Sequence, residues 1–195
     1  MKLLLHICCG PCATYPVKTL RERGHNVHGF FYNPNIHPLA EHNLRLDSAR
    51  KLLEIEAIPA TICNEYDVEE YFRLVAYRES NRCVACYHLR LSRAAREASA
   101  QGFDAFSTSL LVSPYQKHDL IREVGQSAGL QYGIEFYYED FRPGWPQTRQ
   151  LSREMGLYRQ KYCGCIYSEK ERFHSPGSSQ ARIERHGRNQ TDRAR

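Results

Sequence analysis

The chain has 195 residues, enough for one domain with a packed core and too few for two. Its hydrophobic content of 42% is ordinary for a globular protein, and no apolar run approaches the roughly 20 residues that a membrane-spanning helix needs. The formal net charge is +5, from 27 Lys and Arg against 22 Asp and Glu.

The apolar residues 1–5 are too few for a signal peptide and lead through His6 into cysteines, so we expect a cytoplasmic protein that does not associate with a membrane.

Strands alternate with helices in the first third of the chain. Gly10 and Pro11 end the first strand, and Pro11 suits the first turn of a helix. The expected elements are a strand at 2–7, a helix at 11–24, a strand at 27–32, a helix at 37–55 and a strand at 58–63.

The alternation continues through the rest of the body. The expected elements are helices at 67–76 and 83–100, a strand at 103–107, a helix at 114–130, a strand at 133–138 and a helix at 148–157. This pattern indicates an α/β fold with a mostly parallel sheet and helices on both faces. In such sheets ligands bind beyond the C-terminal ends of the strands. We expect residues 1–174 to form a single α/β metalloenzyme domain.

Residues 175–195 form a basic tail rich in Ser, Gly and Arg. Five arginines against Glu184 and Asp192 give it +3 of the net charge, and it contains few apolar residues. We expect a disordered, solvated tail. The alternative is an arm that contacts the phosphates of a nucleic acid.

Seven of the eight cysteines fall into three groups. In a reducing compartment such groups bind metal or do redox work more often than they form structural disulfides. Cys8, Cys9 and Cys12 follow the first strand and open the first helix, where the positive end of the helix dipole stabilises thiolates. We therefore expect this group to ligate a metal.

Cys83 and Cys86 are spaced to share one face at the start of a helix, so both sulfurs can point at one ion or cluster. Together with the first group they supply the four thiolates of a tetrahedral zinc site or an iron–sulfur cluster. Cys163 and Cys165 have two interpretations, as further metal ligands or as a strained, easily reduced disulfide. Cys63 stands alone and is expected to be a core residue.

Two stretches around Gly10 resemble familiar motifs only in part. The stretch Cys9-Gly10-Pro11-Cys12 has the letters of the thioredoxin dithiol, but Cys8 is inserted before it, no Trp precedes it, and the other cysteine groups have no role in a thioredoxin-like oxidoreductase. Gly10 alone is not a phosphate-cradling loop, and no G-x-x-x-x-G-K-[ST] occurs, which argues against ATP use.

Aromatic and polar residues surround the cysteine groups in the segments 32–38, 113–117 and 140–145. Tyr, His and Arg can stack on or clasp an unpaired base, or can serve packing and helix capping.

Several motifs in order resemble the QueH-type epoxyqueuosine reductases, over nearly all of residues 2–168. They are LHICCGPC at 5–12, YNPNIHP at 32–38, RCVACY at 82–87, ST at 107–108 with PYQ at 114–116, and YRQKYCGC at 158–165. The resemblance implies reduction of the epoxide of epoxyqueuosine at the tRNA wobble position to queuosine. It also implies an adenine-nucleotide-α-hydrolase-like (HUP) fold whose nucleotide loop is replaced by metal ligands.

The same resemblance implies a [4Fe–4S] cluster. Its ligands carry over to Cys8, Cys9, Cys83 and Cys86, and a redox-active pair carries over to Cys163/Cys165. A separate mononuclear iron is also implied, with Cys12 as the nearest thiol and Asp140 as a weaker candidate carboxylate. The partners are then tRNA carrying epoxyqueuosine and an unidentified electron donor of the ferredoxin or flavodoxin type.

The chemistry of the residues agrees with this expectation. Removing an epoxide oxygen requires two electrons, protons and a Lewis acid, and thiolate-bound iron can provide the electrons and the Lewis acid. The alternative classes are a thioredoxin-like dithiol oxidoreductase and a zinc-stabilised nucleic-acid-binding domain that uses the same thiolates structurally.

Overall fold

The computed structural model of the chain describes residues 1–174. In chain order its elements are β1 (Lys2–His6), α1 (Gly10–Glu22), β2 (Asn26–Phe31), α2 (Leu39–Ile55), β3 (Ala60–Ile62), α3 (Val68–Val75), the 3-10 helix η1 (Glu79–Asn81), α4 (Arg82–Ala100), β4 (Ala105–Thr108), η2 (Ser109–Val112), α5 (His118–Tyr132), β5 (Glu135–Phe136), η3 (Arg142–Gly144), α6 (Trp145–Glu154) and α7 (Ile166–Phe173). The predicted basic tail at 175–195 lies outside the described residues.

The five strands form one parallel sheet in the order β3-β2-β1-β4-β5. The central strand β1 pairs with β2 on one side and with β4 on the other, so that His6 lies opposite Phe30 and Thr108. The chain winds outward from β1 in both directions. The C-terminal ends of β1 and β4 therefore diverge at a topological switch point, the place where open α/β sheets bind ligands.

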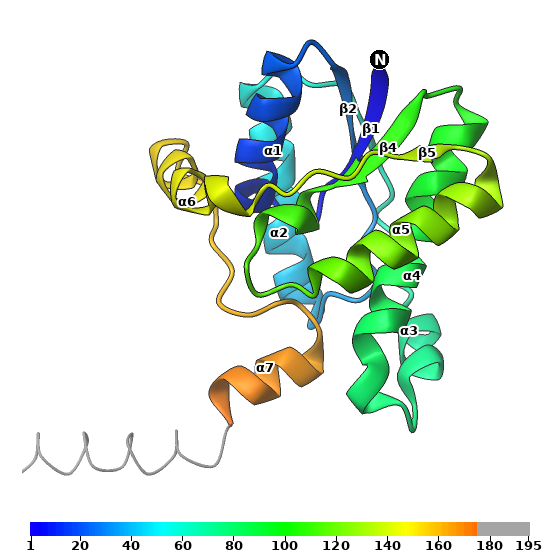
Figure 1. Cartoon of the computed structure of the whole chain (residues 1–195). Helices are drawn as coiled ribbons and strands as arrows, with labels where there is room; N and C mark the ends of the chain where they lie inside the picture. The colour runs from blue at the N-terminus through cyan, green and yellow to red at the C-terminus, as the bar shows by residue number, and fades with distance from the viewer. Residues whose placement is uncertain (175–195) are drawn as a thin grey trace, which may run out of the picture.

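Helices cover both faces of the sheet. Helix α1 packs against α2 and α6 on one side, and α4 packs against α5 and α3 on the other, as Figure 1 shows. The right-handed crossovers of parallel strands require this arrangement, because β1 to β3 wind in one direction and β4 to β5 in the other. Within residues 1–174, no helix is both long and apolar enough to cross a lipid bilayer.

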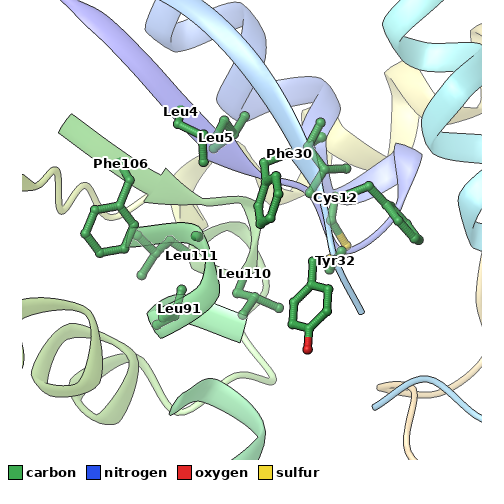
Figure 2. Close-up of a cluster of buried hydrophobic side chains, with 14 of the residues drawn as sticks. Leu4, Leu5, Cys12, Phe30, Tyr32, Leu91, Phe106, Leu110 and Leu111 are labelled. Carbon is green, nitrogen blue, oxygen red and sulfur yellow. The ribbon is translucent and has the colours of Figure 1, made fainter. Parts of the chain in front are cut away.

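The core is built on β1, whose residues Leu3, Leu4 and Leu5 are fully buried between the two helix layers. Burying each such side chain stabilises the fold by about 1.5–3 kcal/mol. Figure 2 shows Phe106 at one side of this hydrophobic cluster and Cys12 with Tyr32 at the other. The first cysteine group therefore belongs to the edge of the hydrophobic core.

The α/β class and the parallel sheet predicted from the sequence are confirmed, and each predicted strand and helix is present with shifted ends. Strand β5 has two residues rather than six, because Gly133 adopts a left-handed conformation to end α5 and the pairing with β4 stops at Phe136. Helix α5 begins later than predicted, since Ser113 accepts a turn hydrogen bond from the backbone of Gln116. Helix α7 was not predicted.

Candidate metal and redox site

The first cysteine group lies at the switch point between β1 and β4. The backbone N–H of Cys8, just after β1, donates to Ser109 Oγ, just after β4, at 3.1 Å. The Ser109 hydroxyl in turn donates to Cys8 Sγ at 3.4 Å. The loops that follow the two central strands are thus joined at the residue that opens the cysteine motif.

The sulfurs of Cys8, Cys9 and Cys12 all lie within 4.8 Å of one another, and each residue is at most 5% exposed. Cys9 occupies the N-cap position of α1 and Cys12 lies in its first turn. Gly10 is required between them, because a Cβ there would fall 2.6 Å from Ser48 Oγ and would overlap the backbone of α2. The glycine thus permits close packing of α1 on α2. The gathered sulfurs form a buried group that can hold a metal.

The three thiols differ in how readily they ionise. Hydrogen bonds from the Cys12 and Cys9 thiols hold the pKa of Cys8 well below its usual value. Burial raises the pKa of Cys9, and hydrogen bonding to Cys8 raises that of Cys12. Without metal, Cys8 is therefore the thiol of the three that loses its proton most readily. Metal binding at this group must displace protons from Cys9 and Cys12.

A cavity of about 210 Å³ lies beside the second cysteine group. Cys83 and Cys86 lie in the first turns of α4 and both line this cavity. Burial raises the pKa of Cys86 to about 12, so its thiolate needs a positive partner.

That partner is Arg90, one turn further along α4. Arg90 is 2% exposed, and its Nη2 donates to Cys86 Sγ at 3.1 Å while its Nε donates to the Cys86 carbonyl oxygen. Its charge also acts on Cys8 and Cys163. Among residues 1–174 it pairs with no carboxylate. A buried cation without a carboxylate is costly, and the thiols around it are the groups that can supply the negative charge.

The third group connects the two cavities. Cys163 lines the smaller cavity and also a larger one of about 470 Å³ that reaches Cys8 and Cys12. Gln116 Nε2 donates to Cys163 Sγ at 3.3 Å, and burial raises the pKa of that thiol. Cys165 lines the smaller cavity and is the N-cap of α7. Burial opposes ionisation of Cys165, but hydrogen bonds from Ser168 and Tyr71 and the positive charge of Arg82 together outweigh it and lower its pKa.

Backbone contacts fix the segment that carries this group. The buried Arg45 of α2 donates from Nη1 to the Cys163 carbonyl at 2.7 Å and from Nη2 to the Tyr162 carbonyl at 2.9 Å. Its Nε pairs with Glu41 at 2.8 Å, one helical turn earlier. The backbone N–H of His37 donates to the Gly164 carbonyl at 2.8 Å. The third group is therefore held against α2 although it lies in a loop.

Three of these polar residues were missed at the level of sequence. Arg90 and Arg45 each carried a weak signal, since Arg90 follows Cys86 by one turn on a face otherwise rich in Leu and Ala, and Arg45 follows Glu41 at the same spacing. Gln160 lies in the motif YRQKYCGC at 158–165, but nothing in that motif gave it a role. Its Nε2 donates to Cys9 Sγ at 3.1 Å and to Cys12 Sγ at 3.3 Å, from a loop that only the tertiary fold brings to α1.

Two other predicted residues lie away from the gathered thiols. Asp140 forms a two-point ion pair with Arg142, with contacts of 2.8 and 2.6 Å, and these bonds lower its pKa to about 2. It is not among the residues that line either cavity. Cys63 is half-buried at the end of β3, packs against the edge of the core and lies 3.9 Å from Arg93 Nη2.

Comparisons with known proteins agree on one family. The family model described as "Epoxyqueuosine reductase QueH" matches residues 3–171. Proteins named epoxyqueuosine reductase QueH include one from Dehalococcoides mccartyi, 40% identical over 91% of this chain and 97% of that protein, and one from Thermotoga maritima, 35% identical over 87% and 91%. A solved structure of a predicted tRNA methyltransferase subunit from Methanocaldococcus jannaschii has a TM-score of 0.50 at 13% identity, covering 78% of this chain and 75% of that one, which shows likeness of fold alone.

Proposed function

The chain belongs to the epoxyqueuosine reductase QueH family, and on that premise we propose that its three cysteine groups reduce the epoxide of epoxyqueuosine in tRNA. It is an oxidoreductase of tRNA modification. The observation that carries the proposal is the gathering of Cys8, Cys9 and Cys12 beside a cavity that also reaches Cys163.

The reaction sets clear requirements. Both carbon–oxygen bonds of the epoxide break, an alkene forms, and the oxygen leaves as water. The balance is two electrons and two protons for each epoxide. The electrons come from outside the chain, and we propose a ferredoxin or flavodoxin as their source.

The residues present fit a [4Fe–4S] cluster with Cys8, Cys9, Cys83 and Cys86 as its ligands. Such a cluster supplies single electrons and Lewis acidity when bound. The donor set supports this choice, because all four residues are cysteines and protein N–H or O–H groups already donate to three of their sulfurs, those of Cys8, Cys9 and Cys86. Arg90 provides the positive charge that a buried anionic cluster requires.

Cys12 is the remaining member of the first group. It lines the larger cavity, and we assign it to the separate mononuclear iron that the family resemblance implies. Asp140 has less support as a carboxylate ligand for that iron, since Arg142 already occupies both of its oxygens.

Cys163 and Cys165 are proposed as a redox-active pair. Formation of a disulfide from two thiols releases two electrons and two protons, which equals the requirement of one epoxide. Both cysteines are free, and Cys163 is open to both cavities. The lowered pKa of Cys165 favours the thiolate that begins thiol–disulfide exchange.

The other assignments follow from the same proposal. Residues 1–174 act as one α/β metalloenzyme domain located in the cytoplasm. Family membership disfavours both the thioredoxin-like oxidoreductase and the zinc-stabilised nucleic-acid-binding domain.

The test is conversion of epoxyqueuosine in tRNA by protein reconstituted with iron and sulfide without air. With dithionite as reductant and neither cobalamin nor ATP added, nucleoside mass spectrometry of digested tRNA should show a product lighter by one oxygen. Protein reconstituted with zinc is the control and should be inactive. A cluster-loaded protein that leaves epoxyqueuosine untouched would contradict the assignment.

A further inference from the structure

Two aromatic rings stand at the cavity that reaches the cysteines. Tyr115, in the loop between η2 and α5, and Trp145, the first residue of α6, both line the cavity of about 470 Å³ that Cys8, Cys12 and Cys163 also line. The two rings meet edge to face, with centroids 6.0 Å apart and planes at 83°. That geometry leaves the faces of one ring uncovered by the other.

Packing in the core does not explain why a tyrosine occupies position 115. Its side chain is 84% exposed and adds almost nothing to the core. Its loop is nevertheless fixed, because Tyr87 Oη donates to Gln116 Oε1 at 2.7 Å and accepts from the Lys117 N–H at 3.2 Å. An exposed aromatic residue on an ordered loop is a feature of binding surfaces.

Trp145 is also held in place. It follows Gly144, where a Cβ would collide with the ring of Tyr15 on α1, so the start of α6 is packed closely on α1. The two rings therefore come from separate, rigid parts of the fold and keep their mutual position. Preorganised aromatic rings lose little entropy when a flat ligand stacks on them.

Positive charge lies beside the rings. Lys161 and Arg172 line the same cavity and are exposed, and neither pairs with a carboxylate of residues 1–174. Stacking rings beside cations are the features with which proteins bind an unstacked nucleotide, whose base meets the rings and whose phosphates meet the cations.

We propose that Tyr115 and Trp145 form a stacking platform for the extruded wobble base of tRNA, with Lys161 and Arg172 on its flanking phosphates. This inference rests on the proposed function, since it supplies the place where the base is held while its modified group reaches Cys8, Cys12 and Cys163. The base and the sulfurs share one cavity, so no domain movement is needed to bring them together.

Trp145 is the only tryptophan of the chain, so its fluorescence reports on the platform directly. The probe is an RNA anticodon stem-loop with guanosine at the wobble position, which binds without turnover, and the control ligand is a fully paired RNA duplex of the same length. With cluster-loaded protein, the stem-loop should quench Trp145 and the duplex should bind at least tenfold more weakly. Quenching by a flavodoxin but not by the stem-loop would overturn the proposal.

Substitutions at the platform test the same proposal in the binding assay. Tyr115→Ala should weaken stem-loop binding about tenfold while Tyr115→Phe keeps it, because one stacked base contributes about that factor. The matched control is Tyr77→Ala, at a tyrosine that is 99% exposed and lines neither cavity, and it should bind like the wild type. Lys161→Ala should reduce the logarithmic salt slope of binding by about 0.7.

Different results would contradict the stacking platform and the proposed epoxide reduction. If the wild type converts epoxyqueuosine but Tyr115→Ala binds the stem-loop and turns over like the wild type, with unchanged iron content, the platform is wrong and the function stands. If the stem-loop quenches Trp145 and Tyr115→Ala weakens binding, but epoxyqueuosine is never reduced, the platform stands and the reaction is wrong.

Discussion

Replacing Arg90 with Met should lower the reduction potential of the bound cluster. Arg90 is buried, its Nη2 lies 3.1 Å from Cys86 Sγ, and no carboxylate of the described chain neutralises it. An added electron would be spread over the cluster, so we take a separation of about 6 Å, and an effective dielectric constant of about 20 then gives an attraction of about 2.8 kcal/mol. For a one-electron couple this energy corresponds to about 120 mV. The sign is negative, because the cation stabilises the reduced form.

The assay is a redox titration followed by the electron paramagnetic resonance signal of the reduced cluster. Arg90→Lys is the matched control, since it keeps the charge and should shift the potential much less than Arg90→Met. Iron content and circular dichroism establish that both variants fold and load. An Arg90→Met protein that carries a full cluster at a potential within about 30 mV of the wild type would refute the electrostatic reasoning.

Three other substitutions test the ligand set, the redox pair and the packing of α1 on α2. Cys83→Ala should fail to retain a full cluster while Cys63→Ala retains it, as measured by iron and sulfide content, and full loading of the first variant would contradict the ligand set. Cys163→Ser should keep the visible absorbance of the cluster and lose turnover, whereas loss of the absorbance would place that sulfur among the ligands. Gly10→Ala should lower the free energy of unfolding by about 1–3 kcal/mol through overpacking against Ser48, and an unchanged urea midpoint would count against this close contact.

The sequence predicted the elements that depend on local pattern. Strand β1 is recognisable because Leu3, Leu4 and Leu5 form an apolar run, and the start of α1 because Pro11 favours a first turn. Helix α7 was missed, since it has only eight residues and none of them is buried. A helix is recognised in a sequence when apolar residues recur at helical spacing, and that pattern arises where one face of the helix is buried.

The candidate site, too, was predicted from the sequence only in part. The grouping of Cys8, Cys9 and Cys12 follows from their spacing at a helix start, and the structure brings their sulfurs together. The approach of Gln160 to that group depends on how a loop far along the chain packs, which no local pattern records. The bridging position of Cys163 between two cavities is likewise a property of the tertiary fold.

The bonds from Arg45 to the segment before α7 have a consequence for how this enzyme can diverge. Arg45 donates hydrogen bonds to backbone carbonyl groups, and every amino acid has such a group. These bonds therefore fix the path of the backbone without requiring particular side chains in this segment. Lys161 can therefore be exchanged while Cys163 keeps its place. If Lys161 contacts the substrate as proposed, selection for another nucleoside or another RNA can act on this loop without altering the cysteine groups, and a mutant library limited to the loop tests whether substrate preference changes.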